Sequence, residues 1–166
     1  MQILSRFTWE LPQTILGLEY SKLMNALYKL DFVEYYDGAT FVVRKGASEN
    51  GITLGSYINI KSTTPKPVNN YHNFDPSQNQ LFMHEYGHYL QSQEYGWAYL
   101  FSVGVPSIIS AAKSKQVWWY DSKLGSYIEV SSHRIKWYER HASKKGYDYF
   151  KKKNEYLYWD EHEYPF

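Results

Sequence analysis

The chain has 166 residues and a formal net charge of +1, with 18 Tyr and 6 Trp but no Cys. Its length predicts a single domain over residues 1–166. The near-neutral charge argues against a nucleic-acid partner, and the absence of Cys excludes disulfides and thiolate metal sites. The many Tyr and Trp suit surfaces with an apolar and a polar end, such as peptide grooves, protein interfaces or membrane interfaces.

The first 60 residues predict one helix followed by β-structure. Residues 1–6 lack a basic segment before an apolar run, so no signal peptide is predicted. The protein is therefore expected in the cytoplasm or to be exported by a non-classical route. Leucines at helical spacing predict an amphipathic helix over residues 11–30. The β-rich runs 40–45 and 52–60 flank a polar, glycine-bounded loop and are predicted to pair as a hairpin. A polar loop follows at 61–75.

Residues 76–95 are predicted to form a helix with clear end signals. Asp75 is a suitable N-cap, and Pro76 fits the first helical position. Gln78 can close a capping box, and Gly96 is a suitable end. The helix has one apolar side for a core and a second side with polar, ionisable groups.

That second side carries an H-E-x-x-H sequence, His84 to His88. Residues four apart lie on the same helix face, so His84 and His88 can bind one metal ion while Glu85 polarises a water molecule beside it. The alternative is a buried structural pair of histidines. Gly87 disfavours the helix, which indicates the close approach of another element.

A catalytic metal site of this kind commonly has a third protein ligand, and a second predicted helix offers one. This helix is expected from Ser131 or Ser132 to Lys145, with Gly146 as its end. Glu139 lies within its apolar stripe, where a carboxylate is costly unless it is paired or bound to metal. His141 points to the opposite side, and His133 is expected in solvent or at the rim of the site. We therefore predict Glu139 as the third ligand, with a salt bridge to a buried Arg or Lys as the alternative.

Residues 95–112 carry no charge over 18 residues, the lower limit for spanning a membrane. Pro106 would interrupt a helix, and Gly104 and several Ser lower the hydrophobicity. We expect this segment to be buried beside the 76–95 helix. Membrane contact is the less favoured alternative.

The H-E-x-x-H sequence and the later Glu139-x-x-Ala142 resemble the gluzincin metallopeptidases. The resemblance implies that His84, His88 and Glu139 bind Zn²⁺ and that Glu85 activates water. Much of the chain also resembles a group of bacterial zincin-like proteins, some of which look like terminal modules of RHS-repeat toxins or effectors. The segments that carry this likeness are WELPQT (9–14), YDGAT (36–40), TLGSYI (53–58), HEYGHYLQSQ (84–93) and GVPSIISAA (104–112).

One position departs from the gluzincin pattern. Gluzincins usually have Asp or Asn after the Ala, where it steadies the first zinc-binding His, and this chain has Ser143. A hydroxyl can still accept a hydrogen bond from an imidazole N–H, but more weakly than a carboxylate. The substitution predicts a less rigid site.

The fold expected from these features is α+β and zincin-like, with the motif helix, a small β-hairpin or sheet, and a second ligand-bearing helix. The expected function is hydrolysis of a peptide or protein substrate by a zinc-activated water, with Glu85 as general base. Tyr138 or His133 would stabilise the oxyanion, and a strand edge would accept an extended peptide. His₂Glu sites also accept other divalent ions.

Two other functions compete with this hypothesis. One is a non-catalytic domain that zinc stabilises, in which the fourth coordination position is closed. The other is a membrane-active or partner-binding toxin module that uses residues 95–112. The substrate and the oligomeric state are left open.

Overall fold

A computed structural model describes residues 2–63, 68–69, 73–122, 124–154 and 156–166. Part of the predicted 61–75 loop, with His72, lies outside these residues. The helices are α1 (Gln2–Arg6), α2 (Leu11–Leu27), α3 (Gln80–Tyr95), α4 (Val105–Ala112) and α5 (Trp137–Lys151). The strands are β1 (Phe32–Tyr36), β2 (Ala39–Lys45), β3 (Asn50–Leu54), β4 (Tyr57–Ser62), β5 (Val68–Asn69), β6 (Asn73–Phe74), β7 (Gln116–Asp121) and β8 (Ser126–Ser131). The architecture is α+β, as predicted.

Within the described chain, the main sheet has the strand order β1-β2-β4-β3. The predicted pairing of residues 40–45 with 52–60 as a hairpin is wrong. Gly55, with a φ of 58°, turns the second run back on itself, so that β3 and β4 pair with each other. β2 then lies parallel to β4, and its hairpin partner is β1. This topology leaves β3 at the edge of the sheet.

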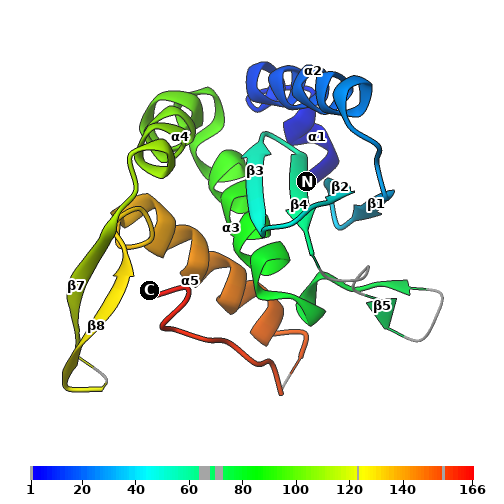
Figure 1. Cartoon of the computed structure of the whole chain (residues 1–166). Coiled ribbons are helices and arrows are strands. Elements are labelled where there is room, and N and C mark those ends of the chain that lie inside the picture. Colours follow the sequence, from blue (N-terminus) through cyan, green and yellow to red (C-terminus); the bar gives the residue numbers. More distant parts are fainter. Residues whose placement is uncertain (1, 64–67, 70–72, 123, 155) are drawn as a thin grey trace.

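The hydrophobic core lies between the sheet and α3, and α2 covers the other face of the sheet (Figure 1). Alternate residues of β2 and β4 meet the apolar side of α3. The buried members are Ala39, Phe41, Val43, Ile58, Ile60, Phe82, Met83, Tyr86 and Tyr89.

The predicted helix at 11–30 is present as α2, but it ends at Leu27 and packs in an unexpected orientation. Its buried residues are Gln13, Gly17 and Ser21, whereas Leu16, Leu23 and Leu27 are at least half exposed. A Cβ at Gly17 would lie 2.2 Å from the Leu54 carbonyl oxygen. The small, polar face of α2 therefore allows it to lie close to the sheet, while its leucines face outward.

The α3 helix begins later than predicted. Asp75 does act as a cap, since its side chain accepts a hydrogen bond from Ser77 N, but it caps a short 3₁₀ turn over Pro76–Gln78. Asn79 has extended backbone and caps α3 itself, because its side chain accepts hydrogen bonds from the backbone N–H groups of Leu81 and Phe82. The predicted end at Gly96 is confirmed, with a φ of 54°.

The second ligand-bearing helix is also shifted from its predicted bounds. α5 begins at Trp137 and continues through Gly146 to Lys151. A Cβ at Gly146 would lie 2.2 Å from Met83 O, and one at Gly87 would lie 1.9 Å from Ala142 O. Gly146 is therefore part of the contact between two helices and does not end one. The close approach predicted at Gly87 is the crossing of α3 and α5.

The expectation that residues 95–112 are buried is wrong for most of the segment. Tyr99 and Val103 are buried against Tyr138, but α4 has no buried residue and Phe101 is 73% exposed. The segment forms a 3₁₀ turn (Gly96–Ala98), a π-helical turn (Leu100–Gly104) and then α4. Pro106 lies in the first turn of α4 and does not interrupt it. No helix among the described residues combines the length and apolar character needed to cross a membrane.

Candidate metal centre

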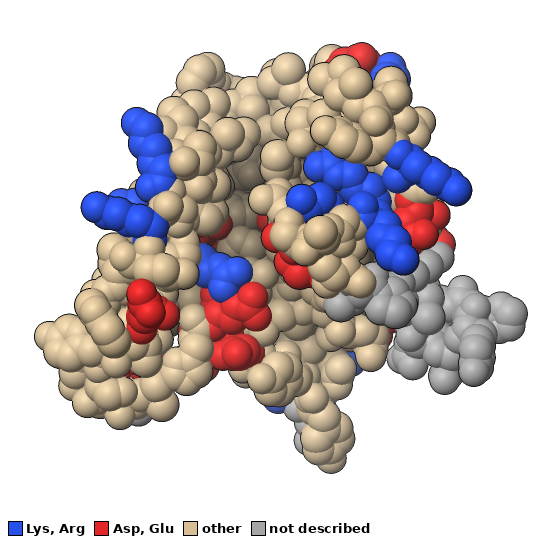
Figure 2. Space-filling view, in the orientation of Figure 1, with Lys and Arg blue, Asp and Glu red and all other residues tan. Residues whose placement is uncertain are grey.

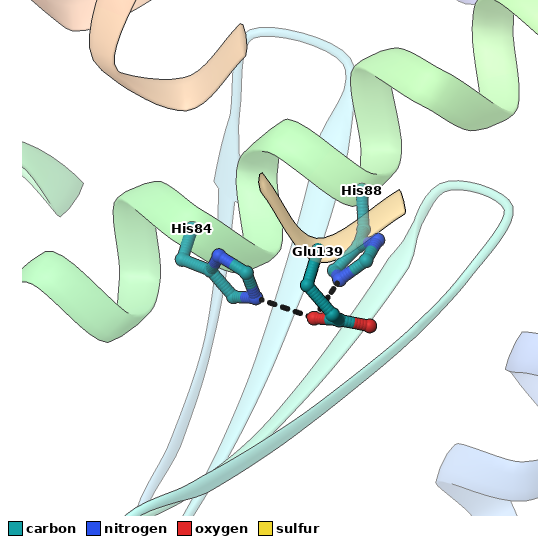
Figure 3. Close-up of side chains that lie close together, drawn as sticks. All are labelled: His84, His88 and Glu139. Carbon is teal, nitrogen blue, oxygen red and sulfur yellow. Dashed lines mark hydrogen bonds and ion pairs between the residues drawn. The ribbon is translucent and has the colours of Figure 1, made fainter. Parts of the chain in front are cut away.

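Two histidines of α3 and one glutamate of α5 converge in the interior (Figure 3). The Nε2 atoms of His84 and His88 lie 3.2 and 3.1 Å from Oε2 of Glu139. The side chains are almost fully buried, and their ligand atoms lie within 4.8 Å of one another. This buried group can hold a metal ion. The α3–α5 crossing is what brings the three side chains together.

Glu139 carries the clearest sign that the group lacks a partner. It is 1% exposed, and its Oε1 has no hydrogen-bond partner among the described residues. Its ion-pair partners in the described chain are His84, His88 and His133, so the predicted alternative of a buried Arg or Lys partner does not occur there. Buried carboxylate oxygens are normally satisfied. Two imidazoles and an incompletely satisfied carboxylate match the donor chemistry of a divalent metal site.

In this group, the attraction between the histidines and the Glu139 carboxylate outweighs the effect of burial on the pKa values of Glu139 and His88. Burial alone would raise the pKa of Glu139, but His88 and His84 outweigh it and hold that pKa well below its ordinary value. Burial alone would lower the pKa of His88, but the Glu139 carboxylate raises it to about 9. These opposite shifts favour a protonated His88 beside an ionised Glu139, and a metal ion that bound there would displace that proton.

Each histidine is oriented by a hydrogen bond at its other ring nitrogen. Nδ1 of His84 lies 3.0 Å from Oγ of Ser143, and Nδ1 of His88 lies 2.8 Å from Oε1 of Gln91. Gln91 donates through Nε2 to the backbone oxygen of Tyr138, so its Oε1 is the acceptor for His88. Both Nε2 atoms are thus directed toward Glu139. Ser143 was expected from the sequence, whereas Gln91 was missed, although it lies three residues after His88 on the same helix.

Glu85 is positioned by the edge strand β3. Its Oε2 accepts a hydrogen bond of 2.7 Å from the Thr53 hydroxyl. A Cβ at Gly51 would lie 2.3 Å from the Glu85 carboxyl carbon, so the carboxylate lies directly against the backbone of β3. The sequence did not reveal these contacts, because they depend on which strand forms the sheet edge.

His133 lies at the rim of the centre and Tyr138 lies deeper. Nε2 of His133 is 3.5 Å from Oε2 of Glu139, while its Nδ1 is 2.6 Å from the Ser110 hydroxyl on α4. The Tyr138 hydroxyl donates to the backbone oxygen of Pro106. His141 faces away from the centre and contacts Tyr95. Glu139, rather than His141, is therefore the residue of α5 that joins the two histidines.

A cavity of about 110 Å³ opens beside the centre. Its lining includes Glu85, His88, Glu139 and His133, together with residues 50–53 of β3 and Ile108 of α4. Figure 2 shows the surface hollowed between the α4 and β3 regions. The geometry defines a buried His–His–Glu group that can hold a metal ion, open to a cavity that also contains a carboxylate.

Comparison with known proteins identifies no family for this chain. No protein-family profile matches the chain, and the searches of curated proteins and of solved structures gave no significant match. The gluzincin resemblance rests on the motif and the downstream glutamate.

Proposed function

We propose that the chain is a zinc-dependent peptidase of zincin type, in which His84, His88 and Glu139 hold the ion. The observation that carries the proposal is Oε1 of Glu139, which has no hydrogen-bond partner among the described residues and lies in a buried group with two oriented histidines. Such a group is costly without a further partner. Zinc is preferred for this donor set, although other divalent ions also bind His₂Glu sites.

Glu85 is the proposed general base. When bound, a zinc ion supplies a water of lowered pKa and a Lewis acid for the substrate carbonyl. The Glu85 carboxylate lines the same cavity and is held by Thr53. In this proposal it accepts a proton at its carboxylate oxygen and then delivers that proton to the leaving amine.

His133 is a better candidate than Tyr138 for stabilising the oxyanion. His133 lines the cavity and carries an imidazole at its rim, whereas the Tyr138 hydroxyl donates to Pro106 O. A donor must point to where negative charge develops in the transition state. Ser110, on α4, holds the other ring nitrogen of His133.

The proposed substrate is a peptide or protein segment in extended conformation. β3 is one of the two edge strands of the main sheet in the described chain, and it lines the cavity. An extended chain can add to such an edge through main-chain hydrogen bonds. The link to RHS-repeat toxins or effectors stays a prediction from the resemblance, as do the cellular location and the single-domain organisation.

One observation favours a second function, contact with a membrane or a partner through α4. Phe101, Val105, Ile108 and Ile109 are 46–73% exposed in a segment without charge. Binding to anionic liposomes that survives His84→Ala would favour this second function. The non-catalytic zinc domain is less well supported, because a cavity opens beside Glu139, whereas a structural zinc site is closed.

Hydrolysis of β-casein by the zinc-loaded protein tests the proposed function. We expect cleavage that stops on removal of zinc with a chelator and falls at least about 1000-fold in Glu85→Gln. Glu94→Gln is the matched control, because Glu94 lies on the same helix and pairs with Lys145 at the surface. Full activity in Glu85→Gln would contradict the proposed mechanism.

A further inference from the structure

The β7–β8 hairpin projects from the body of the protein below α4 (Figure 1). Its register pairs Trp118 with Glu129 and Tyr120 with Tyr127. Because side chains alternate along a strand, Trp118, Tyr120 and Tyr127 share one face. Their exposed fractions are 71%, 52% and 68%. We call these three residues the hairpin platform.

The opposite face of the hairpin holds it to the body. Trp119 lies under the Arg140 guanidinium, which is 5.6 Å from the ring centroid, and Val130 is buried. Trp119 and Ile128 are partly buried on this face. The hairpin is thus anchored on one side, and the platform is left as an exposed aromatic surface on the other.

A groove of about 670 Å³ lies between the hairpin and the C-terminal segment. Its hairpin residues are Gln116, Glu129 and Ser131 on the platform face and Val130 on the opposite face. It shares Asn50, Ala111 and His133 with the cavity beside Glu139. The groove therefore extends from the neighbourhood of the cavity to Glu129, which is the cross-strand partner of Trp118.

We propose that the hairpin platform is a second binding site for the substrate, which holds a part of an extended polypeptide remote from the bond that is cleaved. The inference rests on the proposed peptidase function and names its substrate class: long unfolded or extended polypeptides rather than short peptides. The continuity of groove and cavity identifies the occupant, because a chain that leaves the centre past His133 meets this face. Tyr and Trp provide large contact areas at a small cost in side-chain entropy.

The first test compares two substrates, β-casein and a fluorogenic tetrapeptide. In Trp118→Ala/Tyr127→Ala we expect the KM for casein to rise about tenfold with kcat within about twofold, and the kinetics on the tetrapeptide to be unchanged. The matched control is Trp97→Ala/Tyr156→Ala, which removes residues that are 64% and 89% exposed and lie outside the hairpin. Equal loss on both substrates, or no loss on casein, would overturn the proposal.

The second test measures binding without hydrolysis. Glu85→Gln protein comprising residues 1–166 is titrated into fluorescein-labelled β-casein, and we expect the added platform substitutions to raise Kd about tenfold while the control pair leaves it unchanged. Platform-dependent binding without any hydrolysis would support the platform and contradict the peptidase function. Glu85-dependent hydrolysis with platform-independent binding would do the reverse. A dimer in sedimentation that the platform substitutions abolish would assign this face to a second copy of the chain and overturn the proposal.

Discussion

The α3–α5 crossing and the α4–hairpin region are built in opposite ways. At the crossing, the helix backbones approach closely at Gly87 and Gly146. The two histidines there are oriented by hydrogen bonds to Ser143 and Gln91. In α4 and the hairpin, aromatic and aliphatic side chains face outward, and α4 has no buried residue. The difference separates a closely packed, hydrogen-bonded centre from a surface whose apolar side chains are left exposed. His133 lies between the two, because it contacts both Glu139 and Ser110.

The largest expected effect is at the crossing itself. Gly87→Ala places a Cβ 1.9 Å from the Ala142 carbonyl oxygen, so the helices must separate. We expect the free energy of unfolding to fall by about 3 kcal/mol, measured by urea denaturation. Gly104→Ala is the control, since its Cβ would meet nothing nearer than 3.4 Å. A stable Gly87→Ala protein would contradict the close-packed crossing.

The next effect concerns pH. As pH rises, the stability of the metal-free protein should fall, whereas its affinity for zinc should rise. The pKa of His88 is raised to about 9 from 6.5, so its stabilisation is present below pH 6.5 and is lost as pH rises toward 9. We expect metal-free protein to lose on the order of 2 kcal/mol of unfolding free energy between pH 7 and 9, measured by denaturation. Zinc affinity should rise over the same range, because the ligand His must be neutral. Metal-free stability that rises with pH would contradict the His88–Glu139 ion pair.

A smaller effect is expected from the groups that orient the histidines. Ser143→Ala removes the partner of His84 Nδ1, which should weaken zinc binding about tenfold without abolishing it. Competition with a chromophoric chelator measures the affinity. Ser102→Ala, at an exposed serine that bonds to Ala98 O, is the matched control. If both variants bind zinc like wild type, Ser143 does not steady the site.

The smallest effect is expected on the exposed segment. Phe101→Ser and Ile109→Ser should change the free energy of unfolding by less than about 0.5 kcal/mol, because these side chains are 73% and 49% exposed. Val103→Ser, at a fully buried position of the same segment, should cost about 2 kcal/mol or more. Equal costs at these positions in urea denaturation would remove the distinction between the two regions.

The parts of the centre that the sequence predicted are those set by local geometry. His84 and His88 share a helix face by spacing alone, and Glu139 stood out as a carboxylate within an apolar stripe. Ser143 was singled out by the gluzincin resemblance, as the residue after Ala142. The predictions for the two histidines and Glu139 rested on the helical period, and the shifted ends of α3 and α5 did not affect them.

The parts that were missed depend on contacts between distant segments. Thr53 and Gly51 could not be linked to Glu85 without knowing that β3 is the sheet edge, which Gly55 determines by dividing the predicted strand. Residues 95–112 were expected to be buried because they are apolar, yet α4 is exposed. Hydrophobicity gives the tendency of a segment to be covered, but it does not name the surface that covers it.

The metal content of the purified protein is the most direct test of the central claim, that His84, His88 and Glu139 form a metal site. Elemental analysis should find about one zinc per chain in wild type. Glu139→Ala should lose the metal, and His141→Ala, which alters a histidine that faces away from the centre, should retain it. Wild-type protein without metal after zinc is supplied, or zinc retained in Glu139→Ala, would contradict the claim.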